Sequence, residues 1–547
     1  MLENFGLFLL ILLDSSKIGT VHVDAARFLG AYGGAVVLSP QNRYHGRMKR
    51  YMVLRAVVCA VVLMAMAPVF AAKTAISGLF RFTLDNGLEL FVMENDAVPL
   101  AYIEIAVRAG GVTQQPETAG LFHLYEHMMF KGNALYENQA AVTDAINKLG
   151  VADWNGTTGI DRVNYFFTVP SALLRAGLEF WSYAVRTPLL DERELENEKG
   201  VVLSEIGAHD YDPGHIVAAA LCAHLFAESP WKLDSGGMPQ TVADATVEQL
   251  RAIQRQYYVP NNAALFVGGN VKAANVHKLV KELYGDWERG APVPAVTPPT
   301  KTPFGKRGAV SAAGGTAEPC RLVYANPALN GSYVQAELCL RGPDGETDAA
   351  DTYAADVWAG MVEHPESSFM RILLSDAQLG ISDPDYLSGF YLTRRAAGII
   401  GLSVLMHNGG SPVAQAERFF GDVIEQCIPT FTDDGAFLTA QAISGAKRLM
   451  ADGRIYSLET AEGLLSSLSA VWASCGADYF LGYDDSIAAV TADDIRGFVR
   501  RYLDGVHGVQ LVTVSVDVYQ ENKALFEQAG YREITAENAF WWKKSEE

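Results

Sequence analysis

The chain has 547 residues, of which 49% are hydrophobic and 19% charged, a composition that excludes an intrinsically disordered protein. At about 150 residues per domain, this length allows three to four domains or two large ones. With 43 Lys and Arg against 63 Asp and Glu, the net charge is −20. We expect no nucleic-acid partner, because a strongly acidic protein repels a phosphate backbone.

The N-terminal region predicts export. Residues 56–72 form a short apolar run that follows Lys49, Arg50 and Arg55 and ends in small residues. A basic segment, an apolar core and small residues at a cleavage site are typical of a secretory signal peptide, which we place at 48–72. The apolar core is short for a membrane span, so we expect a periplasmic or secreted protein with no stable span after signal removal. A membrane anchor is the alternative.

Residues 1–47 precede this signal and do not fit it. The signal begins naturally at Met48, so we interpret 1–47 as a non-native or untranslated extension. The alternative is a genuine extension with its own apolar run at 5–13.

The cysteines predict neither a disulfide framework nor a sulfur metal site. Removing Cys59 with the signal leaves five of the six, widely spaced and without a Cys-x-x-Cys pair. We expect most of them to be buried as small apolar residues. A disulfide between Cys320 and Cys339 stays open.

Strands and helices alternate in the first half. Three strands are predicted within 79–109, with an Asn-Gly turn after the first, and an edge strand at 164–170. Helices are predicted at 138–150 and 171–185. Hairpins mixed with helices predict an α+β fold in which helices pack on a sheet.

One short motif, His123-x-x-Glu126-His127, predicts a metal-binding and catalytic site. On a helix the two histidines lie one turn apart, and Glu126 shares their face. Two imidazoles at i and i+4 can bind one Zn²⁺, with the carboxylate beside the open coordination position. The alternative is a pair of surface or core histidines without a metal.

A catalytic zinc needs a third protein ligand, and the helix predicted at 191–206 offers one. Glu205 lies among the apolar residues Val201, Val202 and Ile206, where an ionised carboxylate is costly without a partner such as a metal. Glu198 lies two turns earlier on the same face and is suited to orient a ligand. A solvated helix carboxylate is the alternative for both.

A linker rich in Pro, Thr and Gly divides the chain near 286–305. It separates a first domain at 73–290, which holds the predicted zinc site, from a second at 306–547, with the linker itself at 291–305.

The two halves share a weak internal repeat. Residues 246–257 read TVEQLRAIQRQY and residues 491–502 read TADDIRGFVRRY. Each predicts a helix with Thr at the N-cap and carboxylates in the first turn, and an apolar strand follows each, at 263–269 and 508–516. We infer a duplication; chance likeness of two capped helices is the alternative.

The sequence resembles the pitrilysin–insulinase family of zinc peptidases, in a short form akin to mitochondrial processing peptidase subunits. The matching text is GLFHLYEHMMFKGN (120–133), NGTTGIDRVNYFFTVP (155–170), EKGVVLSEI (198–206) and YYVPNNAALFVGGNV (257–271). The resemblance is strong over most of the first half and weak in the second. It implies two homologous α+β domains, each an antiparallel-rich sheet packed with helices, which face each other across a chamber.

This resemblance also implies the site and the activity. His123, His127 and Glu205 would bind Zn²⁺, Glu126 would be the general base, and Glu198 its supporting carboxylate. The implied reaction is hydrolysis of peptide bonds in unfolded peptides or small proteins by a zinc metalloendopeptidase.

A peptide substrate binds in this family as an added strand. By resemblance, the matching edge here is Asn155-Gly156-Thr157-Thr158. A simple turn is the alternative for this segment.

The second half departs from the family pattern. Active single-chain members carry an Arg and a Tyr seven residues apart in this half, and the corresponding positions here are Ser375 and Ser382. Arg371 and Tyr386 are nearby but misplaced. We therefore expect this zinc-bearing subunit to be completed by a homologous partner subunit that carries the Arg/Tyr pair, or by a homodimer. The alternative functions are a non-catalytic scaffold and a peptide-binding module of the same fold.

Overall fold

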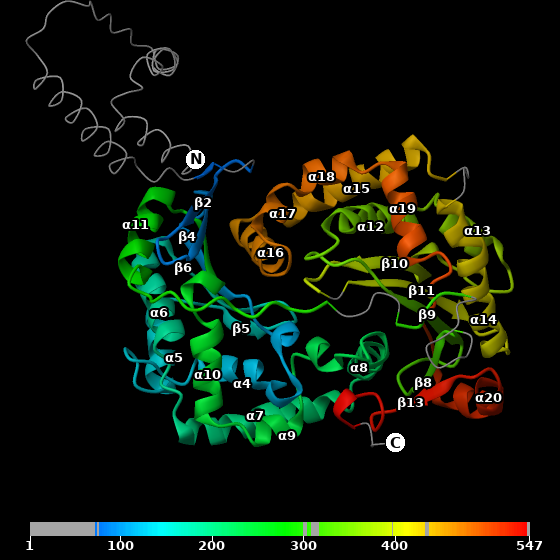
Figure 1. The fold of residues 1–547 in the computed structure, drawn as a ribbon, viewed down its shortest axis with the longest axis horizontal. Coiled ribbons are helices and arrows are strands. Elements are labelled where there is room, and N and C mark those ends of the chain that lie inside the picture. The colour runs from blue at the N-terminus through cyan, green and yellow to red at the C-terminus, as the bar shows by residue number, and fades with distance from the viewer. Residues whose placement is uncertain are drawn as a thin grey trace, which may run out of the picture. The chain divides into compact units, whose positions relative to one another are not determined.

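The computed structural model describes residues 72–73, 76–298, 303–307, 317–396, 398–432 and 437–543 (Figure 1). The predicted extension at 1–47 lies outside these residues, as does the predicted signal peptide at 48–72 except for its last residue. Residues Ala71–Glu547 group into one compact unit.

The first half is built on a seven-stranded sheet of order β1-β2-β3-β7-β4-β6-β5. Its strands are β1 Ala72–Lys73, β2 Leu79–Thr83, β3 Glu89–Glu94, β4 Leu100–Val107, β5 Trp154–Thr158, β6 Val163–Pro170 and β7 Ala263–Gly269. The strands predicted within 79–109 are confirmed as β2, β3 and β4. The prediction of an edge strand at 164–170 is wrong in its position, because β5 pairs with the outer side of β6 and takes the edge itself.

Eight helices are described in this half: α4 Leu121–Met128, α5 Gln139–Lys148, α6 Leu174–Arg186, α7 Glu192–His209, α8 Pro213–Leu225, α9 Pro239–Ala243, α10 Val247–Tyr257 and α11 Ala273–Tyr284. The helices predicted at 138–150 and 171–185 are confirmed as α5 and α6. Apolar side chains such as Leu124, Leu178, Leu250 and Val276 pack these helices, except α8, against one face of the sheet and form the first core.

The second half has a six-stranded sheet of order β10-β11-β9-β12-β8-β13. The strands are β8 Cys320–Asn326, β9 Tyr333–Arg341, β10 Leu387–Leu392, β11 Ile399–His407, β12 Val509–Ser515 and β13 Arg532–Ile534. The helices are α12 Ala349–Val362, α13 Ser368–Ser375, α14 Pro412–Asp422, α15 Ala440–Ser457, α16 Ala461–Ser474, α17 Ala477–Leu481, α18 Tyr483–Ala489, α19 Ala492–Tyr502 and α20 Val516–Gln528.

The strand order confirms the internal repeat. In the first sheet β3 is parallel to β7, and β7, β4, β6 and β5 follow as antiparallel neighbours. In the second sheet β8 is parallel to β12, and β12, β9, β11 and β10 follow in the same way. The predicted helices of the repeat are α10 and α19, and each begins with a capping box, at Thr246 and at Thr491. Each half is therefore one copy of the same sheet with helices packed on it.

Each half covers the sheet of the other with a helix. Leu465 and Trp472 of α16 pack on the first sheet, against residues that include Phe266. Ile216 of α8 packs in return on the second sheet, in a cluster with Leu322. A chamber between the two domains stays a prediction.

A fully buried carboxylate joins α16 to the first sheet. Glu104 of β4 accepts hydrogen bonds from Ser469 of α16 at 2.6 Å, Tyr102 at 2.8 Å, Asn164 at 2.9 Å and Arg162 at 3.1 Å. Burial raises the pKa of Glu104, and Arg162 and the three other donors oppose that rise. The carboxylate is thus both charge-paired and fully hydrogen-bonded, as a buried charge requires.

The five cysteines among the described residues are free, and Cys320, Cys339 and Cys427 are buried. No disulfide is formed among the described residues, so the bridge between Cys320 and Cys339 that the sequence left open is not made.

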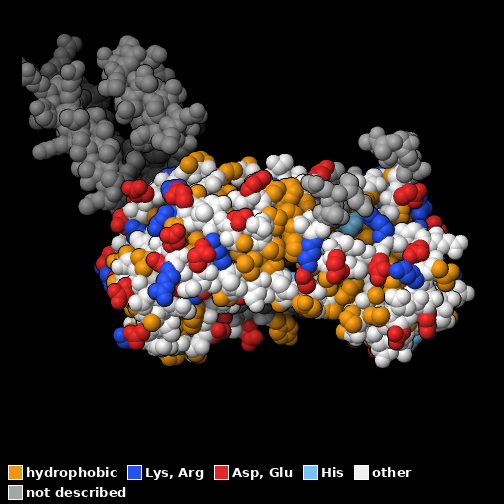
Figure 2. All heavy atoms as spheres, turned by 90° about the horizontal axis from the view of Figure 1, so that it is seen from below, with side chains coloured by type: hydrophobic (Ala, Val, Ile, Leu, Met, Phe, Trp, Pro, Cys, Tyr) orange, Lys and Arg blue, Asp and Glu red, His pale blue; other side chains and the backbone are white. Residues whose placement is uncertain are grey.

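None of the described helices is long and apolar enough to span a membrane. Figure 2 shows a face on which acidic and basic side chains are interspersed and hydrophobic side chains gather near the middle.

Candidate metal centre

The helix α4 presents one apolar and one chemically active face. Gly120 precedes it with a φ of 96°, in the left-handed region, and a Cβ there would lie 2.9 Å from the carbonyl oxygen of Gly236. Leu121, Leu124 and Met128 are fully buried in the core. With this face buried, His123 and His127 face α7, and Glu126 faces β5.

The helix α7 brings two carboxylates to the same place. Asp191 caps it by accepting hydrogen bonds from the backbone N–H groups of Arg193 and Glu194. The helix predicted at 191–206 is confirmed and extends to His209. The predicted burial of Glu205 is wrong, however, because its side chain is 47% exposed. Val201, expected on the apolar face, is 44% exposed, since that side of α7 faces solvent.

Three donor atoms converge between α4 and α7. Nε2 of His127 lies 3.3 Å from Nε2 of His123, and Oε2 of Glu205 lies 3.5 Å and 3.6 Å from these two nitrogens. Donors that are about 2.0–2.1 Å from a tetrahedral zinc ion lie about 3.3–3.4 Å from one another. The three side chains form the one group of metal-binding type found among the described residues, and their spacing fits zinc.

The protonation of both rings suits metal binding. Nδ1 of His127 lies 3.0 Å from Oε2 of Glu198, so Nδ1 carries the proton and Nε2 keeps its lone pair. Burial, followed by the neighbouring His127 and His209, lowers the pKa of His123 to about 4, which leaves that ring neutral at neutral pH. Nδ1 of His123 is itself buried without a hydrogen-bond partner among the described residues.

The buried Glu198 has a second partner that the sequence analysis missed. Nζ of Lys131 lies 2.6 Å from its Oε1, so the carboxylate is held between a lysine and His127. Lys131 follows α4 by three residues, and no pattern in the sequence distinguishes it from a surface lysine. Glu198 contacts His127, and it is not one of the three residues whose donor atoms converge.

Glu126 is buried beside this group and is held by β5. Thr158 donates a hydrogen bond of 2.9 Å to its Oε2. Burial raises the pKa of Glu126; the Thr158 hydrogen bond and His127 oppose this rise, and Glu205 adds to it. The other oxygen, Oε1, lies 2.9 Å from where a Cβ on Gly156 would be, so only glycine fits there.

The segment expected to bind substrate is an edge strand and not a turn. Asn155, Gly156 and Thr157 lie in β5, which pairs with β6 on one side only. The outer side of β5 therefore has main-chain groups available for an added strand. Asn155 and Thr157 are exposed, and Gly156 is buried against Glu126.

The second half does not bring an Arg and a Tyr together at the expected positions. Ser375 ends α13 and donates to the carbonyl oxygen of Ile372, and Ser382 lies 3.0 Å from Nε2 of His407. The ring contacts recorded for Arg371 and Tyr386 are with Phe437 and Tyr333, respectively.

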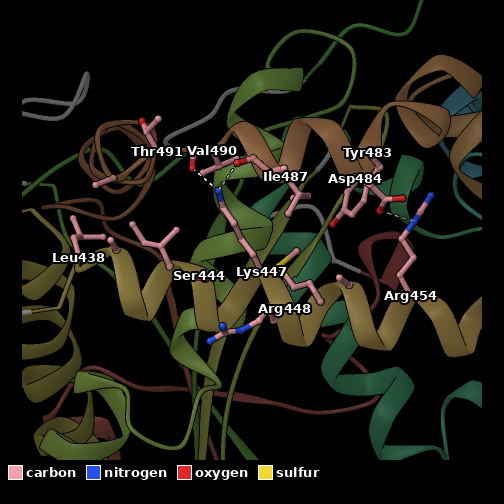
Figure 3. Close-up of a pocket in the computed structure, with 16 residues that line it drawn as sticks. Leu438, Ser444, Lys447, Arg448, Arg454, Tyr483, Asp484, Ile487, Val490 and Thr491 are labelled. Atoms are coloured by element: carbon pink, nitrogen blue, oxygen red, sulfur yellow. Dashed lines mark hydrogen bonds and ion pairs between the residues drawn. The ribbon is translucent and has the colours of Figure 1, made fainter. Parts of the chain in front are cut away.

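A separate hollow lies in the second half. It has a volume of about 790 Å³ between α15, α18 and the start of α19. Figure 3 shows that charged side chains around it already have partners within the protein. Lys447 donates to the main-chain carbonyl oxygens of Ala488 and Val490, and Arg454 forms an ion pair with Asp484. This hollow is therefore a mostly apolar groove. The residues of metal-binding type lie between α4 and α7.

Two family descriptions match successive parts of the chain. Residues 90–234 match the family described as insulinase (peptidase family M16). Residues 244–404 match the family described as peptidase M16 inactive domain. The chain belongs to the M16 peptidase family. The first match contains all the residues of the metal group, and the second spans the linker.

Curated relatives of this M16 protein include several that are named as zinc proteases. An uncharacterised zinc protease YmxG of Bacillus subtilis is 26% identical over 38% of this chain and 50% of its own length. Coenzyme PQQ synthesis protein F of Pseudomonas aeruginosa is 27% identical over 54% of this chain and 38% of its own length. A probable mitochondrial-processing peptidase subunit beta of Arabidopsis thaliana is 25% identical over 37% of this chain and 38% of its own length. The matches thus span half or less of each relative.

Solved structures share the fold over most of the chain. A putative M16-like peptidase from Alicyclobacillus acidocaldarius matches with a TM-score of 0.64 and 17% identity, over 82% of this chain and 100% of its own. The periplasmic protease PqqL from Escherichia coli matches with a TM-score of 0.62 and 16% identity, over 83% of this chain and 49% of its own. At these identities the likeness concerns the fold.

Proposed function

We propose that this M16 protein is a zinc metalloendopeptidase that hydrolyses peptide bonds in unfolded peptides or small proteins. The observation that carries the proposal is the triangle of donors from His123, His127 and Glu205 beside the buried Glu126. A structural zinc site needs no general base, whereas a hydrolytic one does.

The residues around the triangle have separate tasks. Zinc bound there would supply a Lewis acid that activates water and polarises a carbonyl group. Glu126 accepts the proton of the attacking water and passes it to the leaving nitrogen. Glu198 keeps His127 in the tautomer that presents Nε2, and Thr158 keeps Glu126 in place.

We propose that the substrate is an extended peptide added to β5 along Asn155-Gly156-Thr157. The open edge of β5 supports this, because main-chain pairing there would place the scissile bond near Glu126, which lies against Gly156. The relatives' names as zinc proteases agree with a peptide substrate. We also propose export to the periplasm or beyond, on the signal predicted at 48–72, and one structural neighbour is described as a periplasmic protease.

We further propose that a homologous subunit with an Arg/Tyr pair, or a second copy of this chain, completes the site. Ser375 and Ser382 stand where the pair is expected, and a serine is too short to replace either side chain. A positioned donor to a developing oxyanion is worth about 10²–10³ in rate. The alternative is a non-catalytic peptide-binding or scaffold subunit, which the missing pair favours.

Cleavage of a quenched fluorescent peptide tests these proposals. We expect the zinc-loaded chain alone to cleave slowly, a mixture with a homologous Arg/Tyr subunit to cleave about 10²-fold faster or more, and Glu126→Gln to abolish cleavage in the mixture. Glu248→Gln, at an exposed carboxylate of α10, is the matched control. Full activity of Glu126→Gln would reject peptide hydrolysis at this metal group. Equal rates for the chain alone and the mixture would reject only the proposal that a second subunit completes the site.

A further inference from the structure

The central strands of the two sheets carry the same pair of charged residues. Glu104 and Arg108 belong to β4 and the residue after it, and Glu337 and Arg341 belong to β9. The pairing registers make the two glutamates equivalent. Glu104 lies opposite Phe266 of β7, and Glu337 lies opposite Leu511 of the matching strand β12. Both glutamates point to the face that a helix of the other half covers.

The partners of Glu104 have no counterparts around Glu337. By the same registers, the places of Arg162 and Asn164 are taken by Ile399 and Gly401 of β11. Tyr102, whose ring fills the space beside Glu104, is replaced by the shorter Gln335. The second half therefore keeps the carboxylate and loses the cation, the amide and the phenol that satisfy it.

A cavity lies beside Glu337 and Gln335, on the side of the strand that faces β12 and β8. It has a volume of about 170 Å³ between the start of α8 and the second sheet, and its lining includes Glu337, Gln335, Asn326 and Thr513. Among the described residues, the recorded hydrogen bond of Glu337 comes from the thiol of Cys339, at 3.1 Å, and no ion pair is recorded. Burial raises the pKa of Glu337, and the hydrogen bond from Cys339 opposes that rise. Exposed Gly214 at the rim leaves the cavity open to solvent.

We propose that this cavity binds a small organic cation with N–H donors, namely the alkylammonium or guanidinium group that ends a lysine or arginine side chain. Glu337 supplies the charge, as Glu104 does for Arg162. The side-chain oxygens of Asn326, Gln335 and Thr513 can accept the remaining N–H groups. The volume admits such a group and excludes a drug-sized ligand, which needs about 300 Å³ or more.

Saturation-transfer NMR with methylguanidinium and the full chain tests this site. We expect saturable binding with half-saturation at about millimolar concentration, the range for so small a ligand. Glu337→Gln should raise that concentration at least about tenfold. Glu104→Gln is the matched control, because its site is already filled by the chain's own side chains, and it should leave binding unchanged.

Two further measurements keep the site testable if Glu337→Gln fails to fold. Ile399→Arg restores the first half's arginine next to Glu337 and should abolish methylguanidinium binding. Tetramethylammonium, which has the charge without N–H donors, should not compete. Absence of saturable binding, equal binding by Glu337→Gln, or competition by Mg²⁺ at equal concentration would overturn the proposal.

Discussion

Thr158 donates a hydrogen bond of 2.9 Å to Oε2 of Glu126. One residue lies on the edge strand β5 and the other on the helix α4 that carries both histidines. The strand proposed to bind substrate and the proposed general base are therefore directly connected. A peptide added to β5 would be positioned by the same strand that orients Glu126.

Removing this hydrogen bond should slow catalysis without loss of metal. We expect Thr158→Val to lower kcat about tenfold, because Glu126 loses the contact that orients it, with KM and zinc content nearly unchanged. Thr187→Val is the matched control, since that hydroxyl donates to the carbonyl oxygen of Tyr183 and lies outside the proposed metal and substrate sites. Equal kcat values for the two variants would show that the contact with Glu126 has no role.

Adding a methyl group beside Glu126 should have a larger effect. A Cβ at position 156 would lie 2.9 Å from Oε1 of Glu126 and 3.1 Å from Cε2 of Phe130. We expect Gly156→Ala to reduce kcat at least about tenfold by displacing the carboxylate, measured at saturating peptide and zinc. Gly207→Ala on α7 has open space around its Cβ and should retain activity. A fully active Gly156→Ala protein would contradict the placement of Glu126.

The zinc content of variants should distinguish the proposed metal ligands from the residues that only contact or neighbour them. We expect purified wild-type protein to hold about one zinc per chain, and His123→Ala or Glu205→Ala to lose most of it. Glu126→Gln should keep its zinc, and Glu198→Ala should weaken zinc binding about 10–100-fold through His127. Elemental analysis after dialysis against a weak chelator gives these values. Full zinc retention by Glu205→Ala would reject it as the third ligand.

Local sequence patterns predicted much of the fold and the proposed site. The spacing of His123, Glu126 and His127 fixes their common face within a single helical turn, so no tertiary information is needed. Thr246 and Thr491 begin α10 and α19 as predicted, because N-capping is also local. The sequence argument for Glu205 as a ligand rested on its burial, and that premise is wrong because its side chain is half exposed.

Contacts between distant segments escaped prediction. Lys131 reaches Glu198 across two helices, and Ser469 reaches Glu104 across the two halves. Neither residue belongs to a recognisable sequence motif. Their partners can be identified only from the packing of α4 against α7 and of α16 against the first sheet. The position of β6 in the sheet was missed for a local reason, because the short and polar β5 outside it gives a weak strand signal.

Stability should depend on pH through Asp356 of α12. Burial raises the pKa of this carboxyl from 3.8 to about 7, and a hydrogen bond of 2.9 Å from Tyr483 opposes the rise. The folded state therefore favours the protonated form, so its stabilising contribution is complete below about pH 4 and is lost as pH rises through about 7. Asp356→Asn stays neutral, and we expect it to stabilise the protein by up to about 4 kcal/mol at pH 8 and to have little effect at pH 4.

Urea unfolding at pH 4, 6 and 8 measures this difference. Asp485→Asn, at an exposed carboxyl of the nearby α18, is the control and should show a flat difference across the same range. A constant effect of Asp356→Asn at all three values would contradict the raised pKa.

The most direct test is diffraction from crystals of the zinc-loaded protein, with data collected on both sides of the zinc absorption edge. We predict one anomalous peak between α4 and α7, about 2.0–2.2 Å from Nε2 of His123, Nε2 of His127 and a carboxylate oxygen of Glu205. The peak should persist in Glu126→Gln crystals and vanish in His123→Ala crystals. A zinc peak elsewhere, or none at this triangle with zinc in excess, would contradict the proposed metal centre and the peptidase built on it.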